Sequence, residues 1–227
     1  MKAENPNRNV KFAAMTRFLV TFATSIVIAA LGSLIYIYQQ FVVEQKGFQS
    51  DEALRLALGS KFIARTLQDI STDIRSLADS TTMSDFLRDP NNKTTVRLQA
   101  EFLNLVKHTE MYDQIRVISQ SGMEQIRVNF NAGVPVVVDS SRLQDKSGRY
   151  YFTEAMAVDR GQIYISPLDL NVEDGVVEQP FKPTIRCAIP LFVGENVKPV
   201  GVLVLNYMAA QMLQDFEHMM TNSWGIP

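Results

Sequence analysis

The sequence predicts an α+β fold in which helices come first and an antiparallel sheet of five or six strands follows. Three observations support this prediction. A run without charged residues covers residues 18–43, a heptad-like apolar stripe lies in residues 63–77, and the apolar period changes from helical to alternating after Tyr112. The expected order is therefore an N-terminal transmembrane helix, a long stalk helix, a second helix and the sheet.

The uncharged run is long enough to cross a membrane. It comprises 26 residues, from Phe18 to Val43, without Asp, Glu, Lys, Arg or His. About 20 apolar residues at about 1.5 Å each cover the roughly 30 Å hydrocarbon core of a bilayer, where a single span must be helical. A buried core helix would carry a polar stripe, and a cleaved signal peptide would have a shorter apolar region. Tyr36 and Tyr38 near the end of the run are typical of a membrane interface, so we expect an uncleaved anchor.

The charges on either side of the run predict its orientation. Residues 1–17 contain four basic residues and one acidic residue, whereas residues 44–227 contain 18 basic and 23 acidic residues. The positive-inside rule places the basic tail in the cytoplasm. We therefore expect a single-pass protein of the cytoplasmic (inner) membrane, with everything after Glu44 in the periplasm or outside. The acidic balance gives no basic footprint, so we expect no nucleic-acid partner.

Residues 44–90 are expected to form the long stalk helix. Apolar residues recur there at spacings of four and three, and Asp89-Pro90 ends the helix. The stripe can pack against the second helix and the sheet of the same chain, or it can form the seam of a homodimer. It comprises Ile63, Leu67, Ile70, Ile74 and Leu77.

Three shorter helices are expected after the stalk. The first runs from an N-cap at Thr94 or Thr95 to about Lys107. Its apolar face comprises Val96, Phe102, Leu103 and Val106. The other two cover Tyr150–Ala157 and Met208–Met220.

Alternation of apolar and polar residues predicts the strands. Residues 114–119 and 125–130 form a hairpin with Gly122 in its turn, and Pro135 makes residues 134–138 an edge strand. A long polar loop, residues 166–183, separates the third strand from the last two. The remaining strands are residues 163–165, 184–192 and 200–207.

Seven stretches, in their order and spacing, carry a resemblance to a known family. They are Gln114-Ile115-Arg116-Val117, Ile126-Arg127-Val128-Asn129, Leu143–Ser147, Arg149-Tyr150-Tyr151-Phe152, Tyr164–Glu173, Ile185-Arg186 and Gly201–Tyr207. With them the chain resembles the membrane-distal half of a double Cache (PAS-like) sensor domain, as in bacterial membrane sensor histidine kinases and diguanylate cyclases. The resemblance covers roughly residues 40–215. It implies a PAS-like sheet and an extracytoplasmic domain that senses a small molecule in signal transduction.

The resemblance also implies parts beyond this domain. Such receptors continue into a membrane-proximal subdomain, a second span and a cytoplasmic output module. The sequence to Pro227 carries no motif of these parts, so we expect a fragment, a truncated product or a chain that pairs with another. The predicted segments are a cytoplasmic tail (1–17), the transmembrane helix (18–43), the stalk helix (44–90), the PAS-like (Cache) sensor domain (91–207), and a C-terminal helix with a truncated end (208–227).

Arg149-Tyr150-Tyr151-Phe152 is the strongest candidate for a ligand site. The resemblance implies that Arg149 holds a ligand carboxylate, because amino-acid-binding Cache domains have an arginine followed by Trp and Tyr two and three positions later. The fork of an arginine gives a carboxylate two charged hydrogen bonds. The residue nearest to the family's amine-binding Asp is Asn206, so an organic acid fits no worse than an amino acid. Arg149 can instead pair with Asp145 or Glu154.

The site is expected to be one cavity on a face of the sheet, closed by the loop 166–183. Asp169 can take a cationic group or hold a turn, and Arg186 can point into the cavity or pair across the sheet. The expected partner is a small polar or anionic molecule, with a carboxylate among the candidates. The predicted ligand-binding residues are Arg149, Tyr151, Tyr164, Asp169, Arg186 and Asn206.

We expect no enzymatic activity, cofactor or metal site. His108 and His218 are far apart, and the sequence has no HExxH motif, paired cysteines, P-loop or GxSxG motif. The one cysteine, Cys187, lies in an apolar run and is expected to be buried. The alternative to a sensor is a membrane-anchored interaction module that dimerises through the stalk stripe without a ligand.

The orientation can be tested by a fusion. Alkaline phosphatase joined after residue 110 should be active, because the basic tail and the uncharged run place that residue outside the cytoplasm. The measurement is phosphatase activity in whole cells. A fusion that is expressed but inactive would reverse the orientation.

Overall fold

Two structural units make up the chain. The computed structural model describes residues 6–131, 133–173 and 176–221. One unit is Met1–Leu58 and the other is Gly59–Pro227. Helix α1, Pro6–Ala78, supplies the described part of the first unit and the first helical turns of the second. The start of the predicted tail and the predicted truncated end, residues 222–227, lie outside the described residues.

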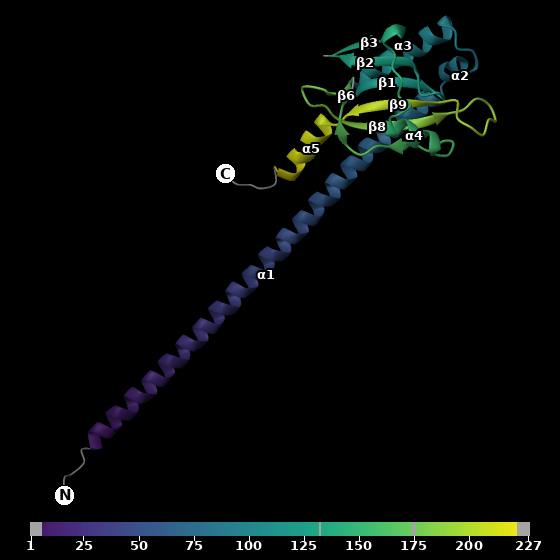
Figure 1. Cartoon of the computed structure of the whole chain (residues 1–227). Helices are drawn as coiled ribbons and strands as arrows, with labels where there is room; N and C mark the ends of the chain where they lie inside the picture. Colours follow the sequence, from purple (N-terminus) through teal and green to yellow (C-terminus); the bar gives the residue numbers. More distant parts are fainter. Residues whose placement is uncertain (1–5, 132, 174–175, 222–227) are drawn as a thin grey trace. The chain divides into compact units, whose positions relative to one another are not determined.

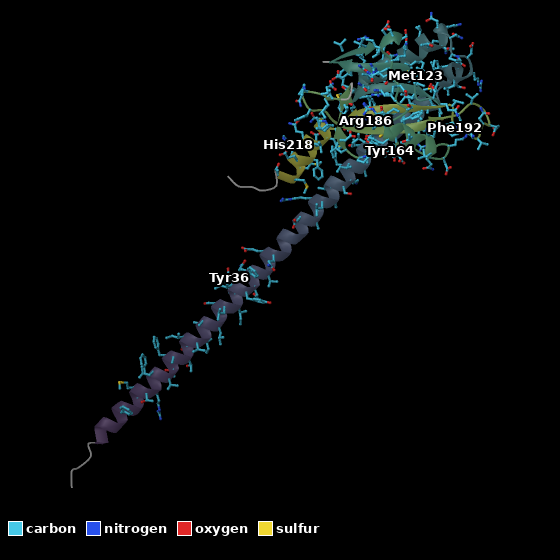
Figure 2. The ribbon with its side chains drawn as sticks, viewed as in Figure 1. Tyr36, Met123, Tyr164, Arg186, Phe192 and His218 are labelled. Carbon is cyan, nitrogen blue, oxygen red and sulfur yellow. The ribbon has the colours of Figure 1, made fainter. Side chains whose placement is uncertain are left out.

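The first unit contains a segment that is long and apolar enough to cross a membrane, Ala14–Gln45. The predicted span, residues 18–43, lies inside it. Figure 2 shows side chains, such as that of Tyr36, projecting from this part of the helix. The hydroxyls of Thr21, Ser25 and Ser33 donate to carbonyls four residues earlier, at 3.0, 2.8 and 2.9 Å. These polar side chains are therefore satisfied within the helix, as a hydrocarbon environment requires.

The second unit is built on one antiparallel sheet of seven strands in the part of the chain that the structure describes. The strand order is β3-β2-β1-β9-β8-β4, and β5 also pairs with β8 (Figure 1). Five or six strands were expected; β5 is the addition, because Asp169 and Leu170 of the predicted loop pair with Thr184 and Pro183. The strands are β1 (Tyr112–Ser119), β2 (Glu124–Asn131), β3 (Val134–Val137), β4 (Tyr164–Ile165), β5 (Asp169–Leu170), β8 (Pro183–Leu191) and β9 (Gly201–Met208), with β6 (Val172–Glu173) and β7 (Val176–Val177) in a separate hairpin.

Helices cover both faces of this sheet. The last turns of α1 and helix α3 contribute to the main core on one face, and α4 lies over β8 and β9 on the other (Figure 1). The predicted hairpin, edge strand and short helix are all confirmed. The helices after α1 are α2 (Thr81–Arg88), α3 (Asn92–Thr109), the 3-10 turn η1 (Ser140–Arg142), α4 (Tyr150–Ala157) and α5 (Ala210–Thr221).

The main core explains the apolar stripe of the stalk. Ile70 and Ile74 are fully buried and Leu77 nearly so, among side chains of α3 and the sheet. The prediction that the stripe is buried is therefore confirmed for these three residues, whereas Ile63 and Leu67 are half-buried. Asp73 lies on the same helix and accepts a 2.6 Å hydrogen bond from the Tyr112 hydroxyl of β1. Burial, followed by this hydrogen bond, raises the pKa of Tyr112, so the phenol stays a donor.

Two expectations about the helix ends were wrong. The stalk helix does not continue to residue 90, because α1 ends at Ala78 and the Ser80 side chain caps a separate helix, α2, by accepting from the Met83 amide. Helix α3 begins one turn earlier than predicted, because Asn91 is its N-cap and the Thr94 hydroxyl accepts a hydrogen bond from the Asn91 amide.

The apolar face of α3 also differs from the prediction. Val96 is 54% exposed, whereas Leu98 is fully buried beside Phe102 and Val106. Leu98, Phe102 and Val106 recur at spacings of four and so share the face of the helix that is buried, whereas Val96 lies off this face.

The turn of the first hairpin positions the segment 144–147. Gly122 has a φ of 90°, and a Cβ there would lie 2.4 Å from the Cβ of Ser147. Glycine is therefore required both by its backbone and by close packing. The Gly122 carbonyl accepts from the Lys146 amide at 2.7 Å, which holds residues 144–147 against the hairpin. Lys146 is thereby placed beside β2.

Burial of the stripe can be tested on the full chain in detergent. Ile70→Asp should lower the free energy of unfolding by at least about 2–5 kcal/mol, because it removes buried apolar contacts and leaves a charge without water or a partner. The matched control is Gln68→Asp on the exposed side of α1, which should change stability little. Equal denaturation midpoints for the two variants would show that the stripe is not part of the core.

Candidate functional site

Polar side chains gather on the face of the sheet opposite to the main core. Strand alternation turns Ile115 and Val117 toward the core and Arg116, which lies between them, toward the opposite face. The strand register then sets polar residues side by side, since Asn206 pairs with both Gln114 and Arg186, and Arg116 pairs with Arg127. All five polar residues are buried. A buried polar face of this kind is unusual for a sheet and indicates a functional site.

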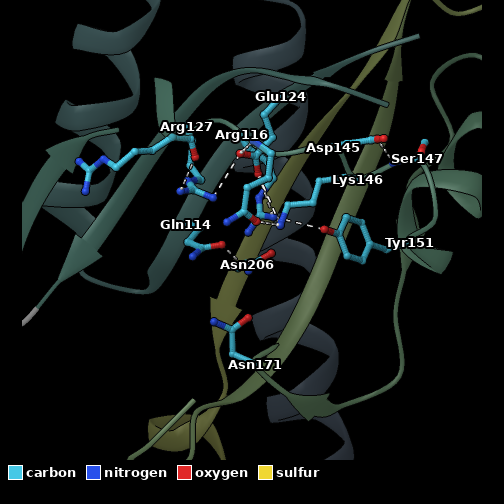
Figure 3. Close-up of polar contacts among 12 residues, drawn as sticks. Gln114, Arg116, Glu124, Arg127, Asp145, Lys146, Ser147, Tyr151, Asn171 and Asn206 are labelled. Carbon is cyan, nitrogen blue, oxygen red and sulfur yellow. Dashed lines mark hydrogen bonds and ion pairs between the residues drawn. The ribbon is translucent and has the colours of Figure 1, made fainter. Parts of the chain in front are cut away.

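Glu124 is the centre of this face, and its side chain has no exposed surface. Its carboxylate lies 3.4 Å from Arg116 Nη1, 3.2 Å from Arg127 Nη1 and 4.0 Å from Lys146 Nζ (Figure 3). The backbone amide of Gln144 also donates to this carboxylate at 3.1 Å. We call Arg116, Glu124, Arg127 and Lys146 the Glu124 cluster. Three buried cations thus share one carboxylate, which leaves a surplus of positive charge away from water.

A cavity of about 120 Å³ adjoins the cluster, and Arg116 belongs to both. Arg116 Nη1 donates to the Tyr151 hydroxyl at 3.2 Å, while Arg116 Nε is buried without a hydrogen-bond partner among the described residues. The Tyr151 ring lies between two guanidinium groups, 6.0 Å from that of Arg116 and 5.4 Å from that of Arg186. The lining residues are Arg116, Arg149, Tyr150, Tyr151, Asp169, Leu170, Asn171, Val172 and Arg186.

The carboxylate in the cavity wall, that of Asp169, is already engaged. It pairs with Arg186 and accepts a 2.7 Å hydrogen bond from the Tyr150 hydroxyl. Burial, together with that hydrogen bond, raises the pKa of Tyr150, so the phenol remains a donor at neutral pH. Arg149, in contrast, is half-buried, and no ion pair joins it to Asp145 or Glu154 in the described part of the chain.

Polar contacts also tie the segment 166–183 to the sheet. Arg186 Nη2 donates to the Asn171 side chain at 3.1 Å, and Asn171 donates to Glu178 at 2.9 Å. Lys182 then contacts Glu178 at 2.7 Å and Asp113 of β1 at 3.0 Å. Burial raises the pKa of Asp113 against the opposing effect of Lys182. Burial lowers the pKa of Lys182, but its hydrogen bonds to Glu178 and Asp113 outweigh this and raise it overall.

Four of the six predicted site residues line one cavity: Arg149, Tyr151, Asp169 and Arg186. The other two do not. Tyr164 in β4 is half-buried and packs against the apolar cluster to which α4 contributes Phe152 and Ala155. Asn206 is fully buried, and its Nδ2 donates to the Gln114 side chain at 3.2 Å.

Sequence reasoning missed three polar residues of the lining, Arg116, Tyr150 and Asn171. A signal existed for Arg116, because each strand of the predicted hairpin carries an Ile-Arg-Val triplet. In such a triplet the arginine points to the face opposite its apolar neighbours. No comparable signal exists for Asn171, whose position depends on how the segment 166–183 folds.

Other features of the molecule do not compete with this cavity. A wider hollow of about 520 Å³ is lined by residues of α1, α5 and β9, but no charged side chain in its lining is buried. Within the described residues, no group of three or more His, Cys, Asp or Glu side chains is placed to hold a metal ion. Cys187 is fully buried, as expected, and burial raises the pKa of its thiol to about 12. Such a thiol is a poor nucleophile.

Comparison with known proteins gives one family match. The model of the family described as "Bacterial histidine kinase, sensor domain" matches residues 58–224, which is more than half of the chain. A search of curated protein sequences finds no match.

Solved structures with this fold are also sensor domains. A domain of a sensory box/GGDEF family protein from Vibrio parahaemolyticus is 26% identical, with a TM-score of 0.64 over 71% of this chain and 60% of that chain. The extracellular domain of histidine kinase vpHK1S-Z8 gives the same identity, TM-score and coverage of this chain, and 57% of its own length. The ligand-binding domain of Campylobacter jejuni chemoreceptor Tlp3 in complex with 4-methylisoleucine is 12% identical, with a TM-score of 0.52 over 73% of this chain and 58% of that chain.

These matches confirm the predicted family resemblance. The chain spans about 60% of the length of the solved domains that it matches. The likeness to Tlp3 concerns the fold alone.

The contribution of the Glu124 cluster to the stability of the domain can be tested. Glu124→Gln should lower the free energy of unfolding by about 3–5 kcal/mol, because three buried cations lose their shared counter-charge. The control is Asp85→Asn, which breaks the 3.1 Å pair with Arg97, both partners of which are about half exposed. That pair should contribute only about 0–1 kcal/mol. Denaturation of each full-length variant measures the difference, and equal losses would mean that the cluster is not a tightly coupled buried group.

Proposed function

The chain belongs to the family of bacterial histidine kinase sensor domains, and we propose that it senses a small anionic molecule bound in the cavity between α4, β8 and the segment 166–183. One observation carries this proposal. Three arginines, Arg116, Arg149 and Arg186, line a cavity in which Asp169 supplies the carboxylate of the described lining. An anionic ligand would supply the missing negative charge.

Arg149 has the central role in the proposed recognition. It stands at the N-cap of α4 and lines the cavity with a guanidinium that makes no ion pair with Asp145 or Glu154 in the described residues. Its planar fork can donate two parallel hydrogen bonds to a carboxylate. The Tyr150 and Tyr151 rings would flank such a ligand. The Tyr150 hydroxyl donates to Asp169, whereas the Tyr151 hydroxyl accepts from Arg116 and could donate its own proton to the ligand.

The cavity suits an organic anion better than an amino acid. An ammonium group needs a carboxylate, yet Asp169 is engaged with Arg186 and Tyr150, and Asn206 lies outside the lining. Tlp3 domains of the same fold are solved with isoleucine and with L-valine. This supports the idea that the fold can hold a small carboxylate, while the chemistry of the wall here favours one without an amine.

The membrane assignment forms part of the same proposal. Residues 18–43 would anchor the chain in the cytoplasmic membrane as a single span, with residues 1–17 in the cytoplasm and the sensor domain, residues 91–207, outside. Sensing would be non-catalytic, and the output would come from a histidine kinase or diguanylate cyclase module. The other segments are proposed on the same grounds, with the stalk running from residue 44 to the end of α1 at Ala78 and a C-terminal segment at 208–227.

A homodimer through the stalk is also proposed, with a restriction on its seam. Ile70, Ile74 and Leu77 pack inside their own domain, so they are not free to form it. Exposed apolar residues four positions apart, such as Leu54 and Leu58, are candidates instead. The alternative, an interaction module without a ligand, assumed a dimer through this stripe, and Ile70, Ile74 and Leu77 are not available for it for the same reason.

Binding can be tested with the full-length chain in detergent micelles and a panel of short carboxylates and amino acids. A ligand at 100 times its dissociation constant should raise stability by about 2.7 kcal/mol, which a thermal shift detects. Arg149→Ala should remove most of the shift, since losing the charged partner of the ligand carboxylate costs about 2–5 kcal/mol of binding. The control is Arg142→Ala, which removes an exposed arginine outside the cavity lining. Unchanged binding in Arg149→Ala would refute the proposed site.

A further inference from the structure

The described side chains around the cavity carry more positive than negative charge, and the difference exceeds one elementary charge. Among the described lining residues, three are arginines, Arg116, Arg149 and Arg186, and one carries a carboxylate, Asp169. The rest of the Glu124 cluster adds Arg127 and Lys146 against Glu124. The contacts that hold the segment 166–183 add two carboxylates, Glu178 and Asp113, and one cation, Lys182. This group therefore lowers the positive charge by one. Among the side chains that the structure describes, which do not include those of Glu173 and Asp174, these groups leave a surplus of two positive charges.

Arg116 is the deeper of two cationic points in the wall. It is only 3% exposed and yet lines the cavity, whereas Arg149 is half-buried. A single nitrogen, Nη1, donates both to the Tyr151 hydroxyl at 3.2 Å and to Glu124 at a long 3.4 Å. The Nε of Arg116 is buried without an acceptor in the described residues. A buried guanidinium that is so poorly satisfied calls for a further acceptor.

We propose that the ligand is a dianion, a short dicarboxylate, whose two carboxylates are bound by Arg149 and by Arg116. This inference rests on the proposed function and specifies its ligand class. A monocarboxylate at Arg149 would leave Arg116 unsatisfied, and a zwitterion would bring an ammonium group into a positively charged cavity. The volume of about 120 Å³ is far below the roughly 300–1,000 Å³ of drug-sized pockets, so the two carboxylates are separated by a few carbons at most.

The test compares acids of equal length in the full-length chain in detergent micelles. Malonate, succinate and glutarate are measured against propionate, butyrate and pentanoate by titration calorimetry, with L-valine as the zwitterion. The best dicarboxylate should bind about tenfold or more tightly than its monocarboxylate partner, because the second carboxylate gains a charged, buried contact.

Two variants separate direct contact from a general effect of charge. Arg116→Met should lower the affinity for the best dicarboxylate about tenfold or more and leave its monocarboxylate partner nearly unchanged, which removes the preference. Arg127→Met is the matched control, because it takes the same charge from the same carboxylate but lies outside the cavity lining. It should keep the preference. Glu124 retains two cationic partners in either variant, and Arg116→Lys, which keeps the charge and loses the fork, replaces Arg116→Met if the latter does not fold.

Each outcome decides between the proposals. Equal affinity for dicarboxylates and monocarboxylates, or tightest binding of L-valine, would overturn the dianion inference, while loss of that binding in Arg149→Ala would leave the proposed function intact. Equal loss of preference in Arg127→Met and Arg116→Met would overturn the contact assigned to Arg116. Binding of none of these acids to the folded chain would overturn both the dianion inference and an anionic ligand for this cavity.

Discussion

The contact of Glu124 with three cations is the interaction on which the polar side of the domain depends. It joins β1 through Arg116, β2 through Arg127, and the segment 144–147 through Lys146. Without the carboxylate, these three charges would repel one another in a site that water does not reach. Arg116 would then lose the carboxylate that holds its guanidinium beside Tyr151, and the cavity would lose its most deeply buried arginine.

The two faces of the sheet have different roles: one forms the main apolar core and the other carries the polar site. The face toward α1 and α3 is apolar and holds the largest fully buried side chains, such as Tyr112 and Phe102. The opposite face combines a smaller apolar cluster, which includes Ala188, Val202 and Val204, with arginines, amides and a buried carboxylate. Because strand alternation alone separates the two sets, β1 can stabilise the fold through Ile115 and Val117 while Arg116 between them serves the site.

Periodicity predicted the elements well because it is a local property. The hairpin, the edge strand and α4 follow from neighbouring residues alone. The break after Ala78 was missed because Ser80 offers its hydroxyl to α2 only when that helix forms, and a polar residue in a helical pattern carries no sign of this. Strand β5 was missed because its pairing with β8 depends on contacts between residues far apart in the chain.

The site was predicted less completely, for a related reason. The arginine and aromatic pattern at the start of α4 located one wall, and Arg186 and Asp169 joined it through their own pairing. Asn206 does not line the cavity, because its side-chain Nδ2 donates to Gln114 on the neighbouring strand β1, and sequence alone did not indicate this neighbour. Which buried residues face one another is set by the register between strands, and sequence periodicity does not determine that register.

The surplus of positive charge connects stability with sensing. A domain that keeps surplus cations away from water is less stable without a ligand than its apolar core would allow. An anion that enters the cavity relieves this cost in addition to forming its own contacts, so binding and stabilisation arise from the same charges. The segment 166–183 lies within this balance, because Asp169 and Asn171 share Arg186 with the cavity. At the end of that segment, the Pro183 carbonyl accepts from the Ala209 amide at 2.9 Å, immediately before α5. The charges of the site are thus linked, through a few polar contacts, to the backbone at the start of α5.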